Sequence, residues 1–131
     1  MAIVEWEFRN VVLAVPAVVA LIEDRLRPII LKPNEVLPAA TYSRTSTRYD
    51  TDVDDAATEY PTMELTLWGF DYLAMKEAVL AVKDAMRTGN HPAPLSAITV
   101  TGEDDVFDDR FQHADGIGVP GVRLECQLIV L

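Results

Sequence analysis

The sequence predicts an α+β fold, in which an antiparallel or mixed β-sheet carries two main helices packed on one face. Apolar residues recur at helical spacing near the N-terminus and again over residues 71–88, and runs of alternating apolar and polar residues lie between and after these segments. The chain has 131 residues, half of them hydrophobic and 24% charged. This balance predicts one domain spanning residues 1–131, with a core large enough to need no disulfide or metal.

Two segments near the N-terminus have helical patterns. Apolar positions spaced by three and four predict an amphipathic helix over residues 3–13, and Pro16 ends or restarts it. Residues 17–26 predict a second short helical segment that Pro28 closes. Three prolines within residues 28–38 then predict an extended crossing over the surface.

Alternating segments predict the strands. Residues 39–46 are rich in threonine and tyrosine, which favour strands. Residues 62–70 predict a second strand with Trp68 on its polar side, and residues 122–131 predict a final strand. Residues 96–101 predict another strand, and residues 106–112 its hairpin partner across an acidic turn at 102–105.

The second main helix is expected to run from Asp71 to about Thr88, with Asp71 as the N-cap and Gly89 as a left-handed C-cap. Its apolar stripe is expected to cover the inward sides of two strands. The predicted core is therefore Leu65, Leu67, Val79, Val82, Leu124, Cys126 and Leu128.

The charge balance excludes several partners. Twenty-one acidic against 11 basic residues give a net charge of −10, which opposes binding to nucleic acid phosphates and to anionic membranes. The apolar run at residues 11–22 contains Pro16 and is too short to cross a bilayer. The acidic start of the chain also differs from a secretory signal, so we expect synthesis for the cytoplasm.

Two dense acidic clusters are candidate functional residues. The first cluster consists of Asp50, Asp52, Asp54, Asp55 and Glu59, and the second of Glu103, Asp104, Asp105, Asp108 and Asp109. The first begins like a calcium-binding loop, but Asp55 stands where that loop needs glycine and Pro61 where it needs glutamate. Five acids and no base predict a solvated loop at residues 50–59, and consecutive acids in the second cluster are typical of a solvated surface. We therefore expect both clusters to act by charge and not by coordination or catalysis.

The sequence lacks the patterns of common catalytic sites. His91 and His113 stand outside metal-binding motifs, and the apolar pattern around Cys126 predicts a buried thiol. No motif supplies a nucleophile, a base and an oxyanion donor together. We expect a protein that is not an enzyme and that holds no cofactor or metal.

Several stretches, taken in order, resemble the tail-completion or tail-terminator family of long-tailed bacteriophages. They are VPAVVALIEDRLRPII at residues 15–30, LPAATYSRTS at 37–46, MELTLWGFDY at 63–72 and AMKEAVLAVKDAM at 74–86. The shared pattern is an Arg-x-x-Pro after a break in helix, a Leu-Pro strand start, and an apolar strand ending in tryptophan that leads into an alanine-rich helix. From residue 95 onward, the resemblance to this family is limited to the predicted strands.

The resemblance implies a homo-oligomeric ring, usually a hexamer, that caps the tail tube and ends its polymerisation. Its partners would be other copies of the chain, the tail tube protein and a head connector or stopper protein. DNA would pass through without specific binding, repelled by the two acidic clusters at the lumen or an interface of the ring, and no membrane would be involved. The protein would be assembled in the host cytoplasm and reside in the virion, at the head-proximal end of the tail.

Three other functions remain open at this point. A tail-tube or minor tail subunit would polymerise into tubes instead of forming closed rings. A small cation-binding α+β module, or a small enzyme, would respond to added cations. A binding domain of another kind would stay monomeric at high concentration.

Overall fold

A computed structural model describes residues 3–51, 57–89, 91, 95–108 and 118–130. The chain forms a five-stranded sheet in the order β1-β2-β3-β5-β4. Strand β1 is parallel to β2 and the other neighbours are antiparallel, so the sheet is mixed. The predicted α+β class is confirmed. The elements are α1 (Val4–Leu13), α2 (Pro16–Ile22), β1 (Leu26–Pro28), β2 (Ala39–Thr51), β3 (Ala57–Trp68), α3 (Tyr72–Thr88), β4 (Leu95–Asp108) and β5 (Val119–Val130).

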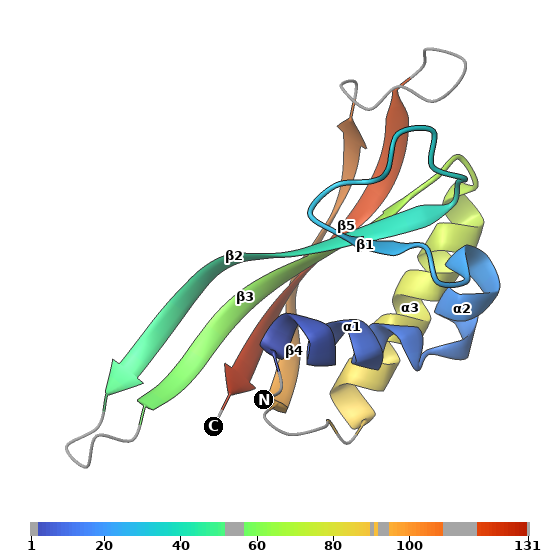
Figure 1. The fold of residues 1–131 in the computed structure, drawn as a ribbon. Helices are drawn as coiled ribbons and strands as arrows, with labels where there is room; N and C mark the ends of the chain where they lie inside the picture. Colours follow the sequence, from blue (N-terminus) through green and yellow to red (C-terminus); the bar gives the residue numbers. More distant parts are fainter. Residues whose placement is uncertain (1–2, 52–56, 90, 92–94, 109–117, 131) are drawn as a thin grey trace.

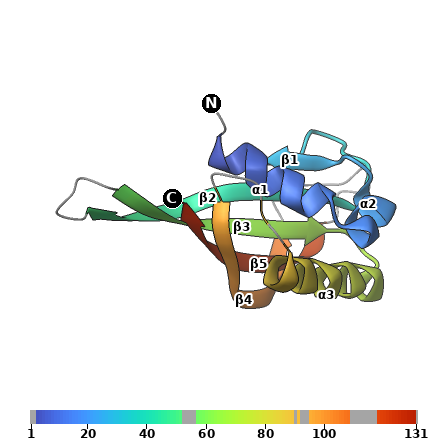
Figure 2. The ribbon, with the colours of Figure 1, turned by 90° about the horizontal axis from the view of Figure 1, so that it is seen from below.

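The three helices cover one face of the sheet and share a single core with it (Figure 2). Phe8 of α1 and Ile22 of α2 are fully buried in the same cluster as the inward side chains of β3 and β5. All seven residues of the predicted core are buried there, namely Leu65, Leu67, Val79, Val82, Leu124, Cys126 and Leu128. The alternation of apolar and polar residues in β3 and β5 therefore predicted correctly which face of these strands is buried.

Helix α3 begins as predicted but ends differently. The Asp71 side chain accepts a hydrogen bond from the Ala74 amide at 3.1 Å, which confirms the N-cap. Gly89 has φ −79° and ψ 156°, so the predicted left-handed C-cap is wrong. The chain leaves α3 in an extended conformation, in which the Gly89 amide still bonds to the Ala85 carbonyl at 2.8 Å.

The N-terminal segments follow the prediction, with one change after α2. Leu26 belongs to β1 and not to the second helix. The turn that separates them contains Glu23 at φ 56°, and Ala40 bonds back to the Arg25 carbonyl at 2.8 Å. This contact directs β1 alongside the start of β2.

Strands β2 and β3 are longer than the sequence predicted and project from the body of the protein (Figure 1). Part of the expected acidic loop at residues 50–59 is strand, because Thr51 pairs with Ala57. Beyond the bulge between Arg44 and Ser46, the two strands form what we call the arm, residues 46–51 and 57–62. The run of acids that predicts a solvated loop at residues 50–59 is equally compatible with a solvated hairpin.

The predicted turn at residues 102–105 is wrong. These residues lie within β4, which continues to Asp108 and pairs along its length with β5. Residues 106–108 therefore continue β4 and are not a returning hairpin partner; residues 109–112 lie outside the described residues. The register of the β4–β5 pairing shifts at a bulge between Val100 and Gly102, and the strand continues beyond it.

Candidate functional site

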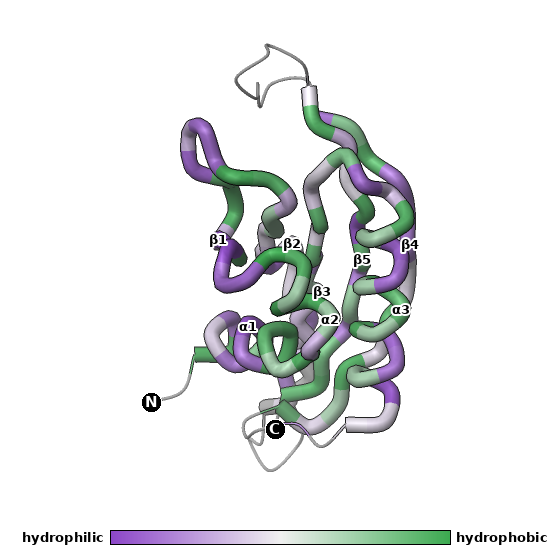
Figure 3. The backbone as a smooth tube through the Cα atoms, turned by 90° about the vertical axis from the view of Figure 1, so that its right-hand side faces the viewer, coloured by the Kyte–Doolittle hydropathy of each residue, from purple (hydrophilic) through white to green (hydrophobic). Residues whose placement is uncertain are grey.

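Glu103 and Asp104 of β4 are bound to cations of the same chain. Glu103 lies beside α3, where Lys83 Nζ donates to its Oε1 at 2.7 Å and Lys76 donates to its Oε2. These hydrogen bonds, first from Lys76 and then from Lys83, hold the pKa of Glu103 below its usual value. The carboxylate therefore links β4 to α3, whose backbones run side by side in Figure 3.

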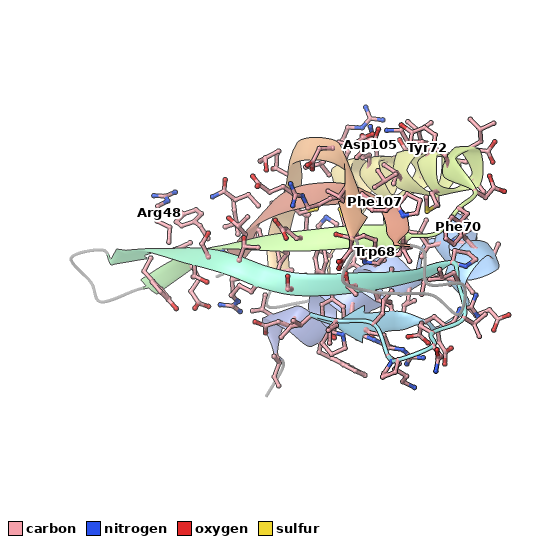
Figure 4. The ribbon with its side chains drawn as sticks, turned by 90° about the horizontal axis from the view of Figure 1, so that it is seen from above. Arg48, Trp68, Phe70, Tyr72, Asp105 and Phe107 are labelled. Carbon is pink, nitrogen blue, oxygen red and sulfur yellow. The ribbon has the colours of Figure 1, made fainter. Side chains whose placement is uncertain are left out.

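The next two acids of β4 have partners as well. Asp104 receives a bidentate contact from Arg123 of β5, at 3.0 Å from Nε and 2.6 Å from Nη2. The hydrogen bond to Asp104 raises the pKa of Arg123. Asp105 accepts a hydrogen bond from the Tyr72 hydroxyl at 3.0 Å, and Figure 4 shows these two side chains together. These acids thus have specific structural contacts on a strand, where the sequence suggested a solvated turn.

The described members of the two predicted clusters do not lie together. Asp108 ends β4 and lines a groove on the opposite face of the sheet, whereas Asp50 and Glu59 are paired-strand positions in the arm. The other predicted members, Asp52, Asp54, Asp55 and Asp109, lie outside the described residues.

A groove crosses the sheet face that is turned away from the helices. It has a volume of about 370 Å³, and Trp68, Phe107 and Arg123 are among its lining residues. Trp68 Nε1 donates to the Thr41 hydroxyl at 3.0 Å, which fixes the indole on the polar side predicted from the sequence. Trp68 and Phe107 lie near each other in Figure 4.

A second groove of about 480 Å³ adjoins the first through Trp68, Thr41 and Ile29. Ile29 has φ 68°, a conformation that costs a β-branched residue free energy, and its amide bonds to the Tyr42 carbonyl at 2.9 Å. The loop that follows is anchored by Glu35, which accepts a hydrogen bond from Arg27 Nε at 2.9 Å. Burial alone would raise the pKa of Glu35, but the bond from Arg27 leaves it lowered.

Exposed apolar side chains gather around these grooves. Ile29 is 78% exposed and Phe107 62% exposed, although both are large hydrophobic residues. Exposed apolar surface of this kind marks interaction sites in soluble proteins. The sequence did not predict this exposed apolar surface, because Ile29 lies in a proline-rich stretch and Phe107 lies among acids. The signal that could have indicated it is a large apolar residue that fits neither a helical nor an alternating pattern.

The arm presents aromatic and basic residues. The Arg48 guanidinium lies over the Tyr60 ring, 4.3 Å from its centroid, and Tyr49 is 61% exposed. A cation over an aromatic face is favourable even at exposed sites. The contact stiffens the arm across its two strands.

No three His, Cys, Asp or Glu side chains within the described ranges are placed to hold a metal ion. Cys126 is fully buried, with its Sγ 3.7 Å from the Met86 sulfur, and burial raises the pKa of its thiol to about 12. Such a thiol is a packing group and a poor nucleophile. His91 contacts the Met86 carbonyl at 3.1 Å, and His113 lies outside the described residues. None of the helices described here is long and apolar enough to span a membrane.

Comparisons with known proteins show the fold. No family model matches the sequence, and no curated protein matches it significantly. One similar solved structure is a chain from the virion of a native gene transfer agent particle, with a TM-score of 0.65 and 13% sequence identity. The similarity covers 93% of this chain and 90% of that chain. The two chains therefore share their architecture over nearly their whole lengths.

Proposed function

We propose that this chain is a structural protein of a phage-like virion. The observation that carries the proposal is the match, over nearly the whole of both chains, to a chain in a gene transfer agent virion. A shared fold at 13% identity is weak support by itself. The surface adds to it, because exposed apolar side chains, a projecting arm and an open sheet edge suit a subunit that is buried in an assembly.

Within the virion, we infer that the chain forms a closed ring, most simply a hexamer, at the head-proximal end of the tail tube. The ring would end tube polymerisation and join the tube protein to the head connector or stopper protein. The order of segments that resembles the tail-terminator family supports this position. No catalytic role is proposed, since the ion pairs and the buried thiol act in the fold.

The acids of residues 50–59 are our candidates for a surface that repels passing DNA. The sequence places five acids and no base between residues 50 and 59, whereas Glu103 and Asp104 are paired with cations of the same chain. Changing Asp50, Asp52, Asp54 and Asp55 to asparagine moves the net charge from −10 to −6. We expect normal particles that eject DNA more slowly. Tails of uncontrolled length from this variant would instead identify the acids as assembly contacts.

Electron microscopy and mass photometry of the purified protein test the ring directly. Subunits of charge −10 repel one another, and salt shortens that repulsion to about 8 Å at physiological ionic strength, so added salt should favour rings. Long tubes would instead favour a tail-tube or minor tail subunit. A monomer at every salt and protein concentration would contradict both assemblies, and a large cation-dependent rise in melting temperature would favour the cation-binding module.

A further inference from the structure

We propose that the connection between β1 and β2, residues 29–38, is a strap that an ion pair holds open and that closes over Trp68 when the pair breaks. The pair joins Arg27 of β1 to Glu35 of the strap. The inference goes beyond the proposed ring, because it concerns the single subunit and is tested on it. It rests on how the strap is anchored, on strain at its first residue and on the groove beside it.

Both ends of the strap are fixed by hydrogen bonds. The Ile29 amide donates to the Tyr42 carbonyl at 2.9 Å, and Arg25 Nε donates to the Pro38 carbonyl at 3.0 Å. The residues between these ends contribute no side chain to the hydrophobic core cluster. The strap can therefore change its position between two fixed ends while the core stays as it is.

The middle of the strap is held by Glu35. Arg27 Nε donates to the Glu35 Oε1 at 2.9 Å, and the Lys32 amide is a longer donor to the same oxygen, at 3.5 Å. The Glu35 side chain is 6% exposed and that of Arg27 is 25% exposed. A buried carboxylate that loses its cation is strongly unfavourable, so Glu35 must move toward water once the pair is broken from the arginine side. Because the strap moves with Glu35, the ion pair works as a latch.

The latched strap is strained at its first residue. Ile29 has φ 68°, a left-handed conformation that costs a β-branched residue free energy. Since its amide is fixed to Tyr42, rotation about the Ile29 N–Cα bond relieves the strain and swings the chain that follows. Ile29 is therefore the hinge of the strap, and release of the latch favours its rotation.

The groove beside the strap gives the direction of this movement. The strap supplies Ile29 and Ile30 to the lining of the groove, and the sheet supplies Thr41 and Trp68. Ile29 is 78% exposed and Ile30 is 72% exposed, so the latched strap holds two large apolar side chains in water beside an indole. Removal of apolar surface from water is favourable. The released strap therefore closes on Trp68.

The latch thereby controls whether an apolar surface is presented or covered. With the ion pair intact, Ile29 and Ile30 stay available to a binding partner, as exposed apolar surface is at interaction sites. With the ion pair broken, the same side chains are buried within the subunit.

Quenching of Trp68 fluorescence by acrylamide tests the closure. The chain has two tryptophans, so all variants would carry Trp6→Phe, which leaves Trp68 as the single tryptophan. Arg27→Ala breaks the latch and should lower the quenching constant about twofold, because closure removes the indole from water. Arg87→Ala is the matched control, since it also removes an arginine from an ion pair and changes the net charge from −10 to −11, but on α3. The control should leave the quenching constant unchanged.

Glu35→Ala is the second latch variant. It removes the buried carboxylate and leaves only the partly exposed Arg27, so it should fold even if Arg27→Ala does not. It should lower the quenching constant in the same way, whereas its matched control Asp84→Ala should not. Both substitutions change the net charge from −10 to −9, and circular dichroism checks that each variant is folded. Quenching that is unchanged or increased in Glu35→Ala would overturn the proposal, because the strap would then stay in place or move away from Trp68.

Serine at both Ile29 and Ile30 separates closure from any other shielding of the indole. These two side chains are the ones that cover Trp68 in the closed strap, so in the double-serine chain Glu35→Ala should no longer lower the quenching constant. A decrease that persists in the double-serine chain would also overturn the proposal. None of these measurements depends on assembly, so a strap that does not close leaves the proposed ring intact, and a chain that forms no ring leaves the strap intact.

Discussion

Lys83 of α3 donates to Glu103 of β4 at 2.7 Å, which ties α3 to the edge strand across twenty positions of sequence. Lys76 donates to the other oxygen of the same carboxylate. Through this contact the acidic half of β4 is held as a strand against the helix. Its acids stabilise the subunit itself, so their removal should affect folding before it affects assembly.

Glu103→Gln should lower the free energy of unfolding by about 1 kcal/mol at pH 7, because it removes a charge-assisted contact from a side chain that is 25% exposed. Chemical denaturation measures the change. Asp84→Asn is the matched control, since it also removes a carboxylate from an ion pair of α3 but one that is largely exposed. An equal loss in both variants would contradict the role of Glu103.

The same contact predicts a pH dependence. The pKa of Glu103 is lower in the folded state, so its stabilising contribution is present above the ordinary value of 4.5 and is lost as pH falls through the folded pKa. The gap in stability between wild type and Glu103→Gln should therefore close on acidification. A gap that stays constant from pH 7 to pH 3 would show that the charge is not responsible.

Gly121→Ala should destabilise the protein by about 1 to 3 kcal/mol, through overpacking. A Cβ at this position would lie 2.7 Å from Trp68 Cε3 and 2.9 Å from the Leu67 carbonyl oxygen. Gly102→Ala is the control, because its nearest contact would be at 3.7 Å. Thermal unfolding of the two variants should differ clearly; equal melting temperatures would mean that Trp68 moves aside without cost.

Val82→Asp should be insoluble or unfolded, because it places a charge without a partner in the centre of the core. Leu80→Asp lies on the same helix but on its exposed side, and its subunit should remain folded. Solubility and circular dichroism distinguish the two. A well-folded Val82→Asp protein with an unchanged melting temperature would contradict the assigned helix face.

Cys126 should react with thiol reagents only when the protein opens, since the side chain is fully buried and burial raises the pKa of its thiol to about 12. A raised folded pKa also means that this residue's contribution to stability is present below the ordinary value of 9.0 and is lost as pH rises toward 12. Labelling kinetics in native buffer and in denaturant measure the protection. Rapid labelling in native buffer would contradict it.

The fold class and core could be predicted because local patterns determine them. Alternation in β3 and β5, and the stripe on α3 from Met75 to Met86, each depend on which residues avoid water, and the structure confirms these faces. The course of β4 could not be predicted in this way. Its acids resemble a turn until Lys76, Lys83 and Arg123 are placed beside them, and those contacts join residues 19 to 27 positions apart.

The surface residues were harder still to predict. Ile29 lines the two grooves because its backbone is left-handed and its amide bonds to the Tyr42 carbonyl. Neither feature leaves a periodic pattern in the sequence. Residues 50–59 predict a loop because their five acids suit a solvated loop and a solvated strand pair alike. The pairing of β2 with β3 determines that the described part of this segment is strand.

Tail length in the particles themselves tests the central claim most directly. We would delete the gene from the genome that produces the particles, restore it on a plasmid, and measure tail lengths by electron microscopy. If the chain caps the tube, the deletion should give tails of irregular, often excessive length that lack heads, and the plasmid should restore one length. Tails of normal length joined to heads in the deletion would contradict the account.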